Sequence, residues 1–154
     1  MSLLEGVKLI TPLAVAFVAA ALALLANRSL DRGRAKRDFI TKIGESLRDD
    51  VRQAVEAAAD YWGPTPSGKS ILEARIKMLE QEIRSAAVIL AEDKNCKEGS
   101  EFTSSLNSFL SVLTGADFES AKVTANQVQI RDVTGRGVAL RKATAQYRRA
   151  QLAK

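Results

Sequence analysis

The chain has 154 residues, a net charge of +5, one cysteine and no histidine. This composition excludes or leaves without support zinc clusters, histidine acid–base chemistry, Cys/His nucleophiles and internal disulfides. We therefore expect a protein that is not an enzyme and that has no metal or cofactor. The lone Cys96 lies in a polar stretch and fits a reducing compartment as an incidental surface thiol.

An apolar run covers residues 9–26, which carry no charge and only one polar side chain, Thr11. A helix of these 18 residues is about 27 Å long at 1.5 Å per residue, close to the ~30 Å hydrocarbon core of a bilayer. We predict one transmembrane helix here, preceded by a short extracytoplasmic N-terminus at 1–8. Pro12 falls in the first turn, where it does not need to kink the helix.

A basic juxtamembrane segment follows at 27–37, where five basic residues and one acidic residue give a net charge of +4. The basic residues are Arg28, Arg32, Arg34, Lys36 and Arg37. The preceding flank carries only Lys8, offset by Glu5. Under the positive-inside rule the N-terminus is outside and the body is cytoplasmic. The compact layout and the Ala/Arg-rich composition suggest a bacterial inner membrane.

Two other interpretations of residues 9–26 remain. A cleaved secretory signal would leave a secreted or periplasmic protein, but the run is long, its leading end is nearly neutral and the charges that follow oppose export. A buried core helix is the other. Small-xxx-small pairs, Ala16 with Ala20 and Ala19 with Ala23, would permit self-association in lipid.

Residues 38–154 predict one all-α domain, an antiparallel bundle of about four helices. The first helix is expected at 36–62, where apolar residues recur every three or four positions. They are Phe39, Ile43, Leu47, Val51, Val55, Ala59 and Trp62. Tyr61 and Trp62 close this helix, either packed over its last turn or as anchors for a partner.

The second helix opens near Ser70 and has the most regular pattern in the chain. Its apolar residues, at intervals of 4, 3, 4, 3 and 4, are Leu72, Ile76, Leu79, Ile83, Ala86 and Leu90. Such an a/d seam is typical of a coiled coil. Because it lasts under three heptads, we expect packing inside the bundle instead.

A short third helix starts at Ser100 or Glu101, carries Phe102, Leu106, Phe109 and Leu113 on one face, and ends at Thr114 and Gly115. We expect Gly115 to adopt the left-handed conformation. The last stretch is ambiguous. Val123, Ile130, Val133, Leu140 and Tyr147 have helical spacing. A hairpin over 127–142, turning at residues 134–137, is the alternative to a helix bent at Gly135 to Gly137.

Charge is segregated along the body. Residues 38–130 hold 10 basic and 15 acidic side chains, whereas residues 131–154 hold seven basic and one acidic. An antiparallel fourth helix would return its basic residues towards the bilayer, where anionic lipid attracts each Lys or Arg by about 1 kcal/mol. The membrane-surface candidates here are Arg141, Lys142, Arg148 and Arg149.

Residues 63–70 match the phosphate-loop pattern G-x-x-x-x-G-K-[ST], with Gly63, Gly68, Lys69 and Ser70 as its members. A phosphate loop must follow a buried strand, but a helical stripe precedes this one. Pro64 and Pro66 also lack the N–H groups that would bind phosphate. We interpret the segment as an interhelical turn with Ser70 as N-cap.

The sequence therefore predicts a single-pass membrane protein that acts as a non-enzymatic tether or assembly subunit. Its expected partners are anionic lipid headgroups and a protein or second copy bound through helical faces. The alternative is a membrane-bound nucleotide-binding protein that uses residues 63–70. Nucleic acid is a less favoured partner, because Tyr147 is the only aromatic residue among the C-terminal basic residues.

Overall fold

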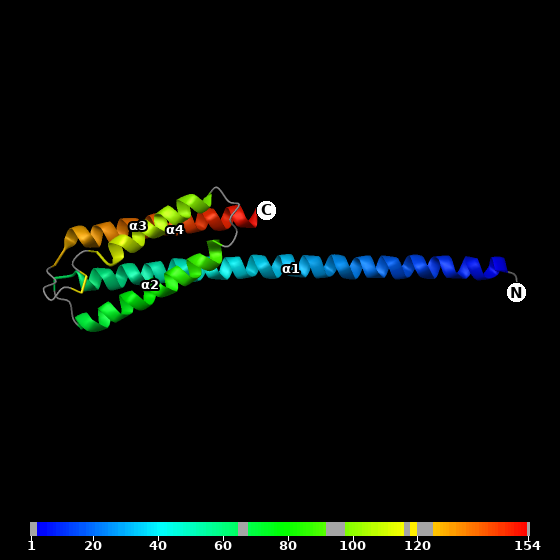
Figure 1. Cartoon of the computed structure of the whole chain (residues 1–154), viewed down its shortest axis with the longest axis horizontal. Coiled ribbons are helices and arrows are strands. Elements are labelled where there is room, and N and C mark those ends of the chain that lie inside the picture. The colour runs from blue at the N-terminus through cyan, green and yellow to red at the C-terminus, as the bar shows by residue number, and fades with distance from the viewer. Residues whose placement is uncertain (1–2, 65–67, 92–97, 116–117, 120–124, 154) are drawn as a thin grey trace. The chain divides into compact units, whose positions relative to one another are not determined.

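Within the residues that it describes, the computed structural model contains four α-helices, α1 (Leu3–Tyr61), α2 (Lys69–Ala91), α3 (Glu98–Leu113) and α4 (Gln127–Leu152) (Figure 1). It describes residues 3–64, 68–91, 98–115, 118–119 and 125–153, and the side chains of 3–27, 29 and 98 lie outside this description. The chain divides into two compact units, Met1–Phe39 and Ile40–Lys154. The all-α prediction is confirmed.

Helix α1 runs without interruption through residues 27–37, so the helix expected at 36–62 begins much earlier, at Leu3. The prediction of a transmembrane span falls on residues 9–26, whose side chains lie outside the described residues. Among the helices as far as they are described, none has the length and apolarity of a membrane span.

The second unit is the helical bundle, and contacts between its helices define their directions. Phe102 of α3 stacks on Tyr147 of α4, while Gln129 near the start of α4 donates a hydrogen bond to the carbonyl of Val112 near the end of α3. Gly137 lies against Val55 and Arg148 against Gly44. Helices α1 and α3 therefore run one way and α4 the other, as antiparallel packing predicts.

The α1 stripe is confirmed at its centre and at its end. Leu47, Val51 and Trp62 are buried, Ile43, Val55 and Ala59 are partly buried, and Phe39 is exposed in the first unit. Five further residues of α1 are buried: Gly44, Ala54, Ala57, Ala58 and Tyr61. The glycine and the three alanines among them widen the buried face beyond one stripe, which the larger apolar residues alone did not indicate.

Helix α2 buries most of its predicted seam: Ile76, Leu79, Ile83 and Leu90. Ala87 takes the buried place expected for Ala86, which is only partly buried. Ile83, Ala87 and Leu90 are again spaced by four and three residues, so the buried face stays continuous. The seam faces the bundle core, as predicted.

Helix α3 is confirmed, with Phe102, Phe109 and Leu113 buried. The expected left-handed Gly115 is wrong, because the positive φ angles of the described residues belong to Gly68 and Glu119. Gly115 instead accepts a hydrogen bond from the N–H of Phe118, 2.8 Å away, and lies against the side chain of Gln129. The lack of a Cβ at Gly115 gives the Gln129 amide room beside it.

The last stretch is a helix, so the hairpin alternative over 127–142 is wrong. Val133, Leu140 and Tyr147 are buried at seven-residue spacing, and Val123 lies outside the described residues. The side chain of Asn126 accepts a hydrogen bond from the N–H of Gln129 and caps the helix. Gly137 is buried within the helix and lies between α1 and α3.

Aromatic side chains close one end of the bundle. The rings of Tyr61 and Trp62 meet edge to face at 5.1 Å, and Phe118 packs 5.3 Å from Tyr61 and 6.3 Å from Trp62. Tyr61 and Trp62 are fully buried. They therefore pack over the last turn of the helix, which was one of the two expectations. They are not available as anchors for a partner.

Candidate functional site

Of the phosphate-loop match, residues 65–67 lie outside the described residues, and the rest forms a helix-to-helix connection. Gly68 has a φ of 68°, which a glycine adopts without strain. Its carbonyl accepts hydrogen bonds from the N–H groups of Ile71 and Leu72, at 2.9 and 3.1 Å. The expected cap at Ser70 is wrong, because α2 already begins at Lys69 and Gly68 precedes it.

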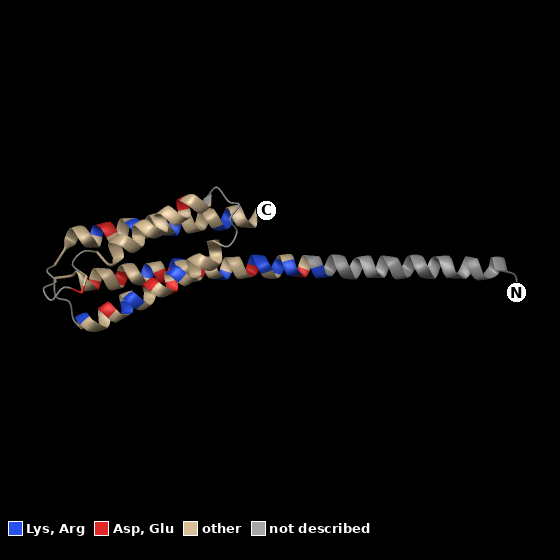
Figure 2. Ribbon diagram, in the orientation of Figure 1, with Lys and Arg blue, Asp and Glu red and all other residues tan. Residues whose placement is uncertain are grey.

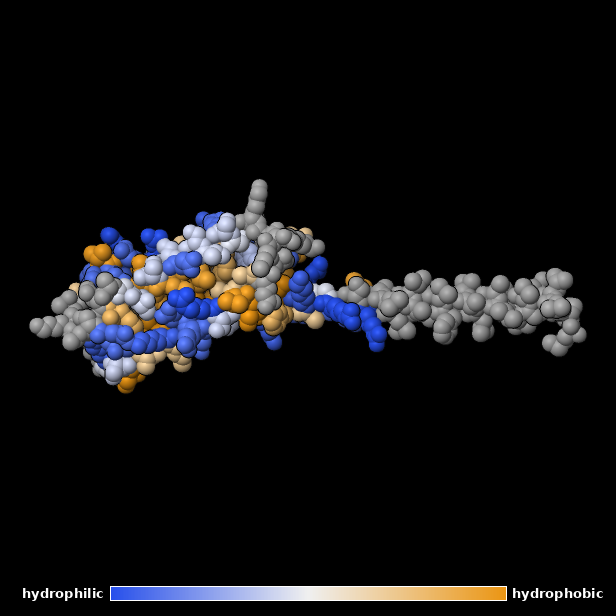
Figure 3. Space-filling view, viewed as in Figure 1, coloured by the Kyte–Doolittle hydropathy of each residue, from blue (hydrophilic) through white to orange (hydrophobic). Residues whose placement is uncertain are grey.

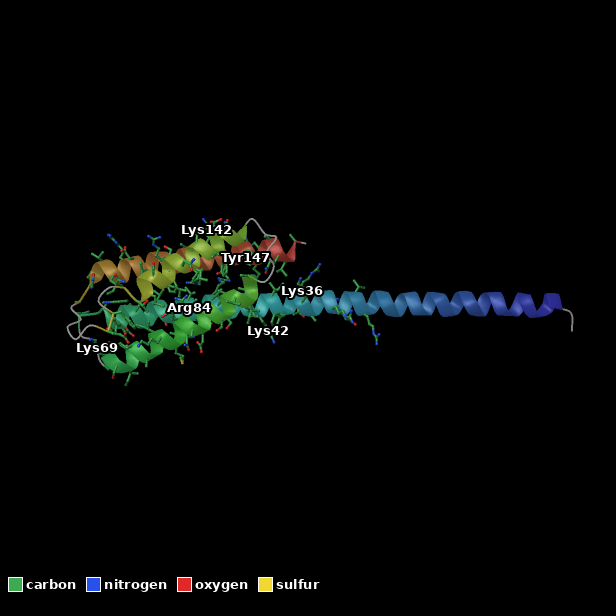
Figure 4. All side chains as sticks on the ribbon, in the orientation of Figure 1. Lys36, Lys42, Lys69, Arg84, Lys142 and Tyr147 are labelled. Carbon is green, nitrogen blue, oxygen red and sulfur yellow. The ribbon has the colours of Figure 1, made fainter. Side chains whose placement is uncertain are left out.

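Lys69 takes part in contacts that join α1 to α2. Its ammonium lies 3.8 Å from the Glu73 carboxylate and 6.0 Å from the centre of the Tyr61 ring. The Tyr61 hydroxyl donates to Glu73 at 2.9 Å and accepts from the N–H of Glu119 at 3.1 Å. Burial raises the pKa of Tyr61, and the neighbouring carboxylates raise it further. Figure 4 labels Lys69 at the start of α2.

The element before this loop is helix α1, whereas a phosphate loop follows a strand. Lys69 is directed at a carboxylate of its own helix, which competes with any phosphate for its charge. The observed geometry therefore explains Gly68, Lys69 and the Tyr61 hydroxyl as parts of a structural connection.

The five basic residues that follow the apolar run are all exposed on α1. They appear in blue within the first unit in Figure 2. Arg28, Arg32 and Lys36 are four residues apart, which places them on one side of the helix. A row of exposed cations on a helix is suited to binding anionic groups on a surface, such as lipid phosphates.

The four C-terminal candidates divide into two pairs. Lys142 and Arg149 are exposed on α4. Arg141 and Arg148 are partly buried, and the Arg148 side chain keeps only 21% of its surface exposed. Arg148 lies 3.5 Å from Glu45 of α1, and its methylene groups pack over Gly44. Sequence reasoning treated the four alike because it could not tell which of them face α1.

A groove of about 600 Å³ lies between α1 and α2. Its apolar lining includes Ile43 from α1 and Met78, Ala86 and Ile89 from α2. Met78 and Ile89 remain 53% and 41% exposed. In Figure 3 exposed hydrophobic residues appear in orange on the surface of the bundle. The sequence signal for this groove is that Met78 and Ile89 lie outside the a/d seam.

Two carboxylates, Asp50 of α1 and Glu82 of α2, also line this groove, and none of its described lining residues is Lys or Arg. Burial raises the pKa of Asp50, and repulsion from Glu82 and Asp49 raises it further. A hydrogen bond of 3.5 Å from the Ser46 hydroxyl only partly offsets this. The groove thus combines apolar walls with negative charge.

Asp49, the acidic neighbour of Asp50 in the sequence, has a different environment. Asp49 is 2.7 Å from Arg52, and hydrogen bonds from Arg52 lower the pKa of Asp49. Asp93 and Glu92, another acidic pair in the sequence, lie outside the described residues. Within the described part of the chain, no group of three or more acidic or thiol side chains is placed to hold a metal ion.

Comparisons with protein-family models, with curated proteins and with solved structures found no match to this chain.

Proposed function

We propose that this protein is a single-pass membrane tether. Residues 9–26 cross the bilayer, the N-terminus is outside, and the helical bundle lies at the cytoplasmic face, where it recruits a partner without enzymatic chemistry. The observation that carries the proposal is the uncharged run at 9–26 followed by five basic residues. Its setting would be a cell membrane of the bacterial inner-membrane type.

The energy of insertion supports this proposal. The run contains five Leu, two Val, one Ile and one Phe. At about −0.3 to −0.6 kcal/mol for each of these residues, insertion is favourable by about 3–5 kcal/mol. The seven alanines contribute little to the free energy of insertion. One or two charged substitutions at the centre of the run would therefore make insertion unfavourable.

The exposed cations supply the second part of the proposal. Arg28, Arg32 and Lys36 on α1 would bind anionic headgroups at the cytoplasmic face. Of the four C-terminal candidates, Lys142 and Arg149 are exposed on α4 and would bind headgroups as well. Arg148 contributes less, because it is held against Glu45 and Gly44.

Carbonate extraction of membranes that contain the full chain tests the anchor. We expect the native chain to stay in the membrane pellet and the double variant Val18→Arg/Leu22→Arg to be released, because each central Arg costs about 2.5–3.5 kcal/mol. The matched control is Leu30→Arg/Val128→Arg, which adds the same charge at positions 59% and 60% exposed. Release of the native chain would refute the proposal.

Orientation is tested by cysteine labelling in a Cys96→Ser background. A membrane-impermeant maleimide applied to intact cells should label Ser2→Cys, whereas Val128→Cys should react only after the membrane is opened. Val128 is exposed, so a lack of labelling before opening reports the membrane barrier and not burial in the fold. Labelling of Val128→Cys in intact cells would contradict the proposed topology.

A further inference from the structure

The groove between α1 and α2 has the dimensions of a helix-binding surface. Its α2 wall extends from Met78 to Ile89, a rise of about 16 Å or three helical turns at 1.5 Å per residue. Ile43 and Asp50 on α1, seven residues apart, form the opposite wall. Two helical walls with an apolar lining are the geometry in which amphipathic helices bind, through residues spaced i, i+3, i+4 and i+7.

The groove is open along its length. Met78 and Ile89 expose about half of their surface, although both are large apolar side chains. Pockets for small molecules enclose most of the ligand, whereas a partner helix needs a wall exposed from one side. Exposed apolar side chains of this kind are buried when a partner binds, and each contributes to the binding energy.

Charge identifies the occupant. Asp50 and Glu82 line the groove without a cation, and burying them beneath a neutral partner would leave two carboxylates without counter-ions. Two basic residues that lie two positions from them in sequence have other partners. Arg52 pairs with Asp49 and Glu56, and Arg84 pairs with Glu80. Because the described lining supplies no cation, a positive charge between Asp50 and Glu82 would come from the molecule that binds.

The same charge argues against a second copy of this chain in a symmetric dimer. A two-fold interface brings the same surface of each subunit together, so a dimer through this groove would bring its carboxylates close to those of its partner. Like charges at an interface cost several kcal/mol. A basic segment of a different protein meets the apolar and the charge requirements together.

We infer that the α1–α2 groove binds a basic amphipathic helix of a partner protein, about three turns long. Its apolar residues pack on Met78 and Ile89, and a Lys or Arg lies between Asp50 and Glu82. This inference rests on the proposed function as a tether and specifies the class of partner that the tether recruits.

The test uses the full chain in nanodiscs of neutral phosphatidylcholine and two synthetic 18-residue helical peptides. Both have a Leu face with one photoreactive benzophenone, and their flanking residues are Lys in one and Glu in the other. We expect the Lys peptide to crosslink to residues 78–89 and the Glu peptide not to. The charge-neutralised variant Asp50→Asn/Glu82→Gln should weaken Lys-peptide binding at least tenfold.

The matched control is Glu101→Gln/Asp132→Asn, which removes the same charge from exposed sites on α3 and α4 and should change binding less than twofold. A second variant, Met78→Lys/Ile89→Lys, should abolish crosslinking while the fold, measured by circular dichroism, is retained. Equal binding by the charge-neutralised variant and the control would overturn the inference. Crosslinks outside the groove would also overturn it, as would a dimer of the native chain that Met78→Lys/Ile89→Lys dissociates.

The result of the peptide-binding test is independent of the membrane tests. If carbonate releases the native chain, the same peptides can be tested in buffer, and the groove is judged by itself. If the chain is retained but the Lys peptide does not bind, the inference fails and the proposed anchor stands.

Discussion

The two halves of the bundle are packed in different ways. Helices α3 and α4 close on each other: the rings of Phe102 and Tyr147 lie parallel at 5.2 Å, and Gly137 allows α4 to approach Phe109 and α1. Tyr147, labelled in Figure 4, is fully buried. Helices α1 and α2 instead leave a groove lined by half-exposed apolar residues. All four helices contribute to the buried core. The difference indicates that the groove face of α1 and α2 adds little to stability and retains surface for a partner.

The largest effect expected from this difference is on the α3–α4 side. Phe102→Ala removes a ring that is 1% exposed, so the free energy of unfolding should fall by about 3–5 kcal/mol. Met78→Ala, in the groove, should change it by less than about 0.5 kcal/mol. Urea titration of the full chain in mild detergent, followed by fluorescence of the single Trp62, measures both. Similar losses for the two variants would show that Met78 belongs to the packed core and not to a surface left for a partner.

Two glycines of α4 give a sharper test, with smaller expected changes in the free energy of unfolding. A Cβ at Gly137 would lie 2.6 Å from Cγ2 of Val55 and 3.3 Å from Phe109, whereas one at Gly135 would meet nothing within 4 Å. Gly137→Ala should therefore destabilise the fold by about 1–2 kcal/mol, because overpacking outweighs the gain in helix propensity. Gly135→Ala should stabilise it by about 0.5–1 kcal/mol.

The same urea titration measures both glycine variants, and each is the control for the other because they change the same atoms in one helix. Stabilisation by both would show that α4 has room to move away from Val55. The close packing at Gly137 would then be unnecessary for the fold.

These glycines also show how much of the fold the sequence could predict. The four helices and the seam at Ile76, Leu79 and Ile83 followed from apolar spacing, because burial of one helical face leaves a periodic pattern. Gly135 and Gly137 suggested a turn or bend, since glycine disfavours helix. The structure explains Gly137 by its contact with Val55 and Phe109, which are distant in sequence and leave no local signal.

The candidate site was less predictable for the same reason. The phosphate-loop match was a local pattern, and the structure gives Gly68 and Lys69 structural roles. The α1–α2 groove depends on which faces of two helices remain uncovered, and this is set by where α3 and α4 pack. Met78 and Ile89 are visible in the sequence as apolar residues outside the seam, but the position of Asp50 beside Glu82 requires the fold.

The smallest effect concerns Asp49 and Asp50, which are adjacent in sequence and shifted in opposite directions. The pKa of Asp50 is raised in the fold by burial and by Glu82, so its ionised form disfavours folding above that pKa, and the penalty disappears as the pH falls. The pKa of Asp49 is lowered by Arg52, so its contribution to the free energy of unfolding is favourable at neutral pH and is lost as the pH falls through its folded-state pKa.

Asp50→Asn should therefore raise the melting temperature at pH 7 and Asp49→Asn should lower it, and both differences should shrink towards pH 3. Circular dichroism of the full chain at the two pH values measures this, and a shift of the same sign for both variants would show that the groove does not hold Asp50 in an unfavourable charged state.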